Sequence, residues 1–231
     1  MDEDVGQAIT DYAIKRTHTT ARDYALSIRI SMNRKGQIFV ISAPSGSGKT
    51  TICKRVLRRI KSLTPSISVT TRHPRPGEKN KKDYHYISVE SFKKKIEEES
   101  FFEWTENFGY FYGTPKGFIL ENIRKGKNLL LSIDMKGAAH IKRKFPDSVL
   151  IFIKPPSLKE LSHRLRRRAS DGKAEIVKRL RKAKKELSYA SRYDYVVINN
   201  RLDDAVDEVV SIIRKEINKD SNKTFEKLIP A

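Results

Sequence analysis

Residues 43–50 combine the residue types that hold a phosphate chain. The segment reads Ala-Pro-Ser-Gly-Ser-Gly-Lys-Thr and follows the apolar run 38–41. A glycine-rich turn between a buried strand and a helix points backbone N–H groups at phosphate oxygens. Its lysine reaches the outer phosphates of a nucleoside triphosphate, and the next hydroxyl is a Mg²⁺ ligand. The expected phosphate-binding residues are therefore Ala43, Pro44, Ser45, Gly46, Ser47, Gly48, Lys49 and Thr50.

One position of this loop departs from the pattern G-x-x-x-x-G-K-[ST], because Ala43 stands where the pattern has glycine. An incidental glycine-rich turn is the alternative interpretation. The strand before the loop and the helical pattern after it favour phosphate binding.

A second set of anion-binding residues lies in the proline-rich segment 72–83. Arg72 and Arg75 are three residues apart there, and two guanidinium groups on a stiff loop suit a second phosphate group. Tyr84 and Tyr112 could add phenolic donors, although each tyrosine taken alone fits a core or sheet position better. The spacing therefore predicts a site for a second phosphorylated ligand.

Apolar runs alternate with helical patterns along most of the chain, which predicts an α/β fold with a parallel sheet flanked by helices. Expected strands cover 38–41, 66–70, 84–87, 128–133, 149–153 and 195–198, and 101–112 is extended. Expected helices cover 51–60, 91–99, 114–124, a segment opened by the Ser157 capping box, 174–190 and 203–217. The short strands within 66–113 interrupt the alternation and predict an inserted lobe that sets substrate specificity.

Composition narrows the function classes. The 231 residues are 38% hydrophobic, carry a formal charge of +20 and include one cysteine, Cys53. The chain has no apolar run of the roughly 20 residues that a membrane span needs. We expect a cytoplasmic protein in a reducing compartment, without a secretory signal or a membrane partner. A basic excess also fits a nucleic-acid binder, but no aromatic-basic repeat accompanies it, so we expect no specific nucleic-acid partner.

Several motifs together resemble the guanylate kinase family over about residues 36–217. They are the segment 68–78, Asp83-Tyr84, Phe102-Glu103-Trp104, Tyr112-Gly113-Thr114 and Ile133-Asp134-Met135. The resemblance implies a phosphate-loop kinase core, an inserted small mixed α/β GMP-binding lobe and a helical lid. It also implies transfer of a phosphoryl group from ATP to GMP, or to dGMP, with Mg²⁺ as cofactor.

The resemblance assigns roles residue by residue. It implies that the GMP phosphate is bound by Arg72, Arg75, Tyr84 and Tyr112, with Glu78 also in the substrate site, and guanine by Ser68, Glu103 and Thr114. Asp134 is expected near Mg²⁺ or the acceptor, and Asn199 on the adenine side. Lys49, Arg72 and the lid arginines Arg164, Arg168 and Arg179 are the expected catalytic set.

The expected domain limits follow from these motifs. Residues 1–34 form an N-terminal extension that we expect to be poorly ordered, 35–220 the kinase-like domain, and 221–231 a tail. Within the domain, 35–65 and 115–217 form the core, 66–113 the lobe and about 160–180 the lid. The sequence leaves the oligomeric state open between a monomer and a homo-oligomer.

The sequence departs from the family pattern at two places, and three alternative functions are to be weighed against the kinase. Ser132 replaces the first acid of the family's Asp-Ile-Asp, and Ala169-Ser170 follows Arg168 where the family has glycine. The rivals are a phosphate-loop kinase for another anion, a guanylate-kinase-like binding module and a nucleic-acid binder. The intact Gly46, Gly48, Lys49 and Thr50 favour an enzyme over a binding module.

Overall fold

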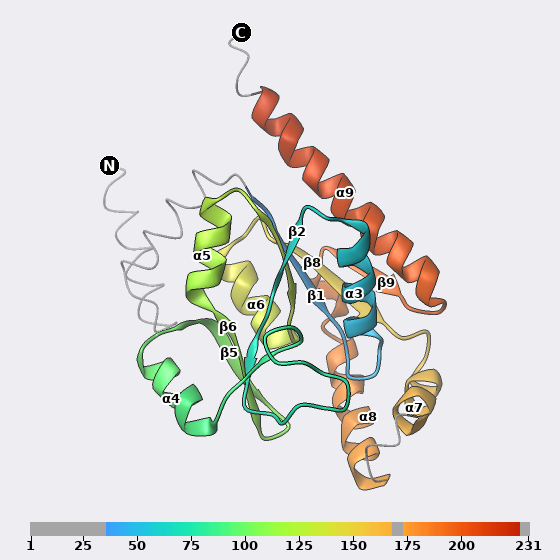
Figure 1. The fold of residues 1–231 in the computed structure, drawn as a ribbon. Helices are drawn as coiled ribbons and strands as arrows, with labels where there is room; N and C mark the ends of the chain where they lie inside the picture. Colours follow the sequence, from blue (N-terminus) through green and yellow to red (C-terminus); the bar gives the residue numbers. More distant parts are fainter. Residues whose placement is uncertain (1–35, 168–172, 227–231) are drawn as a thin grey trace, which may run out of the picture.

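A five-stranded, wholly parallel sheet forms the centre of the molecule (Figure 1). This is a computed structural model, and it describes residues 36–167 and 173–226. The strand order is β2-β7-β1-β8-β9. The strands are β1 Ile38–Ser42, β2 Leu63–Ser66, β7 Asn128–Ser132, β8 Val149–Lys154 and β9 Tyr195–Ile198.

Helices cover both faces of this sheet, as the alternation of apolar runs predicts. Phe39 and Ile41 of β1 pack on the side of α3 (Lys49–Arg59) and α9 (Leu202–Glu226). Ile38 and Val40 point the opposite way, toward α5 (Lys116–Arg124) and α6 (Met135–Lys144). Alternate residues of a strand face opposite sides, so one apolar run serves two cores.

A second sheet of mixed direction lies beside the first, in the order β4-β3-β6-β5. Its strands are β3 Val69–Thr70, β4 His85–Tyr86, β5 Phe101–Asn107 and β6 Tyr110–Pro115. Helix α4 (Val89–Glu97) begins after Ser88, whose side chain accepts a hydrogen bond from the Ser91 N–H. Phe92 of α4 stacks on Phe101 and Phe111, and so attaches the helix to the β5–β6 hairpin.

Two helices lie at the end of the sheet where β1 runs into α3 (Figure 1). Helix α7 (Leu158–Arg167) begins after Ser157, whose hydroxyl accepts the Glu160 N–H at 3.0 Å. Helix α8 (Lys173–Leu187) packs on it through a small apolar cluster that includes Leu161, Leu165 and Ala183. The 3-10 turn η1 (Ala190–Arg192) then leads to β9.

Several local expectations were wrong. The strand expected over 66–70 is divided between β2 and β3, which belong to different sheets. The extended segment 101–112 is a hairpin that turns at Phe108 and Gly109, both with positive φ. Trp104 is 47% exposed, because its strand neighbour Glu103 takes the inward position.

Other differences concern helices. Helix α6 was not predicted at all, and α9 extends to Glu226, nine residues beyond the expected end at 217. Thr114 does not cap a helix: it lies in β6, and α5 starts two residues later. None of the helices in residues 36–167 and 173–226 has the length and apolar content that crossing a membrane requires. The extension predicted over 1–34, Arg168 and residues 227–231 lie outside the described residues.

Candidate active site

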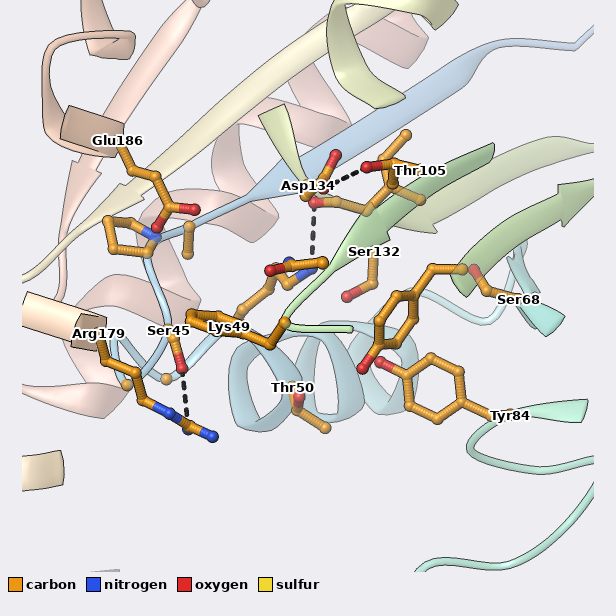
Figure 2. Close-up of a pocket in the computed structure, with 18 of the residues that line it drawn as sticks. Ser45, Lys49, Thr50, Ser68, Tyr84, Thr105, Ser132, Asp134, Arg179 and Glu186 are labelled. Carbon is orange, nitrogen blue, oxygen red and sulfur yellow. Dashed lines mark hydrogen bonds between the residues drawn. The ribbon is translucent and has the colours of Figure 1, made fainter. Parts of the chain in front are cut away.

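A cavity at the carboxyl ends of the parallel strands brings the two predicted anion sites together (Figure 2). This edge is where α/β sheets place their ligands. The lining residues come from the phosphate loop, the second sheet, the end of β7 and helix α8. Those predicted from the sequence are Ala43, Pro44, Ser45, Gly46, Gly48, Lys49, Thr50, Ser68, Arg75, Tyr84, Glu103, Tyr112, Asp134 and Arg179.

The backbone of the phosphate loop is shaped by its glycines. Gly46 and Gly48 have φ values of 94° and 90°, which L side chains rarely adopt. Gly48 occupies the N-cap of α3 and has no side chain to satisfy the first N–H groups of the helix. Those groups, together with the positive end of the helix dipole, are available to an anion.

Asn199, the residue after β9, supports this loop. Its side-chain amide donates to the Ser47 carbonyl at 2.8 Å, and the residue is only 4% exposed. The structure does not place Asn199 among the residues that line the cavity. Its visible role is to hold the loop, and contact with adenine stays a prediction.

Lys49 extends along the floor of the cavity. Its ammonium group donates to the Ile133 carbonyl at 3.0 Å, at the end of β7. Burial lowers the pKa of Lys49, while Cys53, Asp134 and Glu186 oppose that shift. Thr50, the next residue, is exposed at the cavity wall. The loop therefore offers a cation, a hydroxyl and backbone donors on one surface.

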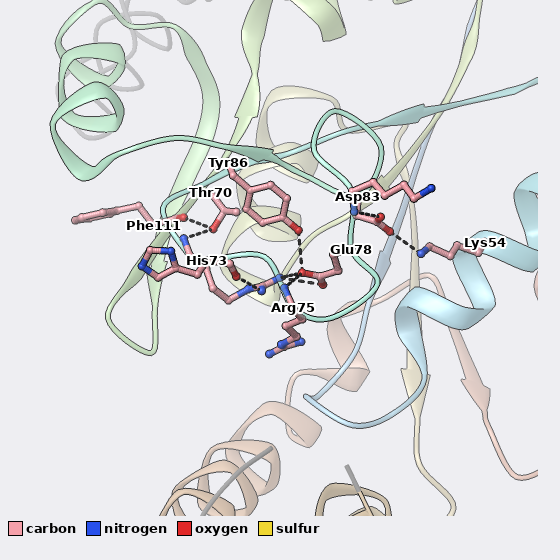
Figure 3. A network of polar contacts seen from close by, with 10 residues as sticks. Lys54, Thr70, His73, Arg75, Glu78, Asp83, Tyr86 and Phe111 are labelled. Atoms are coloured by element: carbon pink, nitrogen blue, oxygen red, sulfur yellow. Dashed lines mark hydrogen bonds and ion pairs between the residues drawn. The ribbon is translucent and has the colours of Figure 1, made fainter. Parts of the chain in front are cut away.

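Arg72 is held in place by Glu78, whose carboxylate accepts several of the hydrogen bonds drawn in Figure 3. One guanidinium nitrogen lies 3.0 and 2.9 Å from the two carboxylate oxygens, and the arginine side chain is 10% exposed. The same carboxylate accepts the Arg75 N–H and the Tyr86 hydroxyl, each at 2.8 Å. Despite partial burial, these donors lower the pKa of Glu78, so it stays ionised. Glu78 thus organises the arginine loop without lining the cavity.

Two tyrosines stand between this loop and the cavity. The rings of Tyr84 and Tyr112 meet edge to face, with centroids 6.0 Å apart. The Arg72 guanidinium lies 5.4 Å from the Tyr84 ring centroid. The structure therefore groups Arg72, Arg75, Tyr84 and Tyr112, as the spacing predicts, although Arg72 lies behind the residues that line the cavity.

Glu103 is the buried carboxylate of the site. It is 4% exposed, so it is not a solvated carboxylate on the outside of its strand. The Thr114 hydroxyl donates to its Oε1 at 2.5 Å, and Oε2 has no hydrogen-bond partner among the described residues. Burial raises the pKa of Glu103 to about 7. The site therefore contains a buried acceptor oxygen that is costly to leave unpaired.

Asp134 joins β7, β5 and α6. It is the N-cap of α6: its Oδ1 accepts the Gly137 N–H at 2.9 Å, and its Oδ2 accepts the Thr105 hydroxyl at 3.3 Å. This N-cap is the signal that would have predicted α6. Asp134 still faces the cavity between Lys49 and the second sheet.

The lid arginines differ in their placement. Arg179 of α8 reaches the Ser45 hydroxyl at 3.5 Å and lines the cavity. Arg164 of α7 instead donates to Glu160 at 2.8 Å and to the Asn199 carbonyl at 3.1 Å, away from the cavity. Arg168 is outside the described residues.

Four lining residues were not predicted from the sequence: Thr105, Asn107, Phe108 and Glu186. Glu186 lies two helical turns after Arg179, so helical periodicity places both on one face of α8. Burial raises the pKa of Glu186 to about 7, against the opposing influence of Lys182, Lys49 and the Ser45 N–H. Thr105 lies two residues beyond Glu103 on β5, so strand alternation would have placed it on the same face.

Comparison with known proteins agrees with this geometry. The guanylate kinase family model matches residues 35–216. The chain belongs to the guanylate kinase family. Guanylate kinase from Caldanaerobacter subterraneus subsp. tengcongensis is 46% identical over 83% of this chain and 95% of that protein. Guanylate kinase from Thermotoga maritima is 44% identical over 79% of this chain and 88% of that protein.

A solved structure supports the same family. The crystal structure of guanylate kinase from Anaplasma phagocytophilum superposes with a TM-score of 0.68 at 35% identity. The match covers 80% of this chain and 87% of that one. The resemblance to guanylate kinase stated from the motifs is therefore confirmed, as is the α/β fold with a parallel sheet.

Proposed function

We propose that this chain transfers the terminal phosphoryl group of ATP to GMP, giving ADP and GDP. The observation that carries the proposal is the cavity in which a phosphate loop faces a buried Glu103–Thr114 pair and the arginine loop. Family membership supports the same reaction.

The donor half of the proposed site needs no covalent chemistry. The loop backbone and Lys49 would bind the phosphates of ATP, and Arg179 would approach them from α8. A phosphate oxygen of GMP is already a nucleophile, so no general base is needed. Rate acceleration then comes from in-line positioning and from neutralising charge as the phosphoryl group moves.

The acceptor half would recognise GMP at both ends. Arg75, Tyr84 and Tyr112, with Arg72 behind them, would bind its phosphate. Ionised Glu103 would accept hydrogen bonds from the ring N–H and the exocyclic amine of guanine. Adenine lacks that pair of donors, so the buried carboxylate would stay unpaired against AMP. Sites of this kind reject the wrong analogue by a factor on the order of 10⁴.

The oxygen atoms that lie between the proposed ATP and GMP sites suit Mg²⁺ as ligands. Thr50, Ser132 and Asp134 present oxygen atoms to the cavity, which is the ligand type this ion prefers. Among residues 36–167 and 173–226 no group of three or more His, Cys, Asp or Glu side chains could hold a metal alone. We therefore propose that Thr50, with Asp134, holds Mg²⁺ only together with the nucleotide phosphates. When bound, the ion would neutralise phosphate charge.

The test is an assay of ADP release with ATP and Mg²⁺ in which GMP, dGMP, AMP, CMP and UMP are offered separately. We expect turnover with GMP and also with dGMP, because the side chains proposed to bind guanine and phosphate do not depend on the 2′-hydroxyl. Turnover with another base, or with none, would overturn the proposal. Chromatographic detection of GDP confirms the phosphorylated product.

We also propose that the reaction takes place in a reducing compartment, consistent with cytoplasm. The one cysteine of the sequence, Cys53, is buried in the core on α3 and has no partner for an internal disulfide.

A further inference from the structure

The first turn of α6 lies directly against the Glu103 carboxylate. Gly137, the third residue of that helix, is buried at this contact. A Cβ at position 137 would lie 2.7 Å from Oε2 of Glu103 and 3.0 Å from its carboxyl carbon. Real Cβ atoms essentially never come within 3.0 Å of another heavy atom in this way. The helix and the carboxylate can therefore keep these positions only when residue 137 has no side chain.

The backbone at this position gives no reason for glycine. The φ angle of Gly137 is outside the left-handed range, so an L residue could adopt it. Glycine within a helix costs about 1 kcal/mol relative to alanine. The space needed by Glu103 is thus the feature that explains glycine here.

Each partner is anchored by a hydrogen bond that a displacement would disturb. Oε1 of Glu103 is fixed by the Thr114 hydroxyl at 2.5 Å. The Gly137 N–H is fixed by Oδ1 of Asp134 at 2.9 Å, and Thr105 holds the other oxygen of that aspartate. A new methyl group would therefore push the carboxylate from its position or pull the helix from its cap.

We propose that Gly137 is a specificity-determining residue of the acceptor site, acting by positioning Glu103. This rests on the proposed function of Glu103 in guanine recognition. The bare α-carbon lets the first turn of α6 form a wall behind Oε2, so the carboxylate faces the acceptor base. A side chain at 137 displaces that oxygen. It therefore weakens the binding of each acceptor nucleotide in proportion to how far that nucleotide depends on Glu103.

The first test compares Gly137→Ala with the wild type in steady-state kinetics. We expect kcat/KM for GMP to fall about 10- to 100-fold, the range for misplacing a buried polar group. KM for ATP should stay within about twofold, because the phosphate loop does not contact residue 137. IMP lacks the exocyclic amine of GMP, so the preference for GMP over IMP should shrink. Equal losses for GMP and ATP would overturn the proposal.

Gly117→Ala is the matched control. Gly117 also lies in the first turn of a helix, α5, but it is exposed, and a Cβ there would meet nothing within 4 Å. This variant should keep the kinetic constants of the wild type, with an unchanged or slightly higher unfolding midpoint. Together the two variants separate the effect of a helical alanine from the effect of contact with Glu103.

A double-mutant cycle measures the contact without depending on activity. Urea unfolding is compared for Gly137→Ala in the wild type and in the Glu103→Ala variant, which lacks the carboxylate. We expect Gly137→Ala to lower the unfolding midpoint in the wild type and to leave it unchanged or raise it in the Glu103→Ala background. If Gly137→Ala does not fold alone, the double variant should restore folding. Equal destabilisation in both backgrounds, or no restoration, would overturn the proposal. Failure of wild-type turnover with GMP would instead reject the proposed function and leave this cycle interpretable.

Discussion

The donor and acceptor halves of the cavity are built in opposite ways. The donor half is one continuous loop, residues 43–50, that offers backbone groups shaped by Gly46 and Gly48. The acceptor half draws side chains from segments between Ser68 and Asp134, which two sheets and α6 bring together. A backbone cradle binds any chain of phosphates, whereas a set of fixed side chains distinguishes one base from another.

The halves also differ in how their charged groups are supported. Lys49 is held in position by its own helix and by one hydrogen bond, which its ammonium group donates to the Ile133 carbonyl. Arg72, Glu78 and Tyr86 hold one another, and Glu103, Thr114, Gly137 and Asp134 form a second connected group. We therefore expect donor substitutions to act on turnover directly. Acceptor substitutions should act through neighbours and chiefly change KM for the acceptor.

The largest effect should come from Lys49→Ala. Removal of the loop lysine withdraws charge stabilisation from the transferring phosphoryl group, so kcat should fall by about 10³-fold or more. Stopped assays of GDP formation measure this loss. Lys61→Ala, an exposed lysine beyond the same helix, is the control and should be unchanged. Retention of most activity in Lys49→Ala would show that the two halves are not divided as described.

A smaller effect should come from Glu78→Gln. The neutral amide loses the charge that orients Arg72 and accepts fewer of the hydrogen bonds now donated by Arg72, Arg75 and Tyr86. KM for GMP should rise about tenfold, while KM for ATP stays unchanged. Exposed Glu97→Gln on α4 is the matched control. A change confined to kcat would mean that Glu78 supports the reaction and not the binding of the acceptor phosphate.

The third effect concerns stability and pH. Burial raises the pKa of Glu103 to about 7 from its ordinary value of 4.5, so the folded state binds a proton that the unfolded state has released. Stability should therefore fall as pH rises from about 4.5 to 7, by up to about 3 kcal/mol for this group. Urea unfolding of wild type and Glu103→Gln across this range measures the difference. The pKa of Glu186 is also raised, and Glu186 is present in both proteins. If stability depends on pH in the same way in the wild type and in Glu103→Gln, the effect does not come from Glu103.

The sequence predicted the donor half almost completely, because its information is local. A strand, a glycine-rich turn and a helix start follow one another within residues 38–60. The parallel sheet was equally accessible from apolar runs. The arginine loop, Glu103 and Thr114 were found through motifs, and the pairing of Glu103 with Thr114 across β5 and β6 is a finding of the structure.

The missed features are those that depend on distant residues. Helix α6 was overlooked because Asp134 was considered only as a ligand, although it also caps the helix. Glu186 enters the cavity only because α8 packs near the phosphate loop. The orientation of Arg164 toward Glu160 and Asn199 likewise depends on tertiary packing, which spacing along the chain does not encode.

The central claim is that Glu103 reads the acceptor base while the phosphate loop binds the donor independently. The most direct measurement is the kinetics of Glu103→Gln with GMP varied at saturating ATP and with ATP varied at saturating GMP. Glutamine keeps the size, but when its one oxygen accepts the Thr114 hydroxyl, its amide group faces guanine as a donor where the wild type has an acceptor. We predict that kcat/KM for GMP falls about 100-fold or more while KM for ATP changes less than about twofold. Equal losses for both nucleotides would contradict the account.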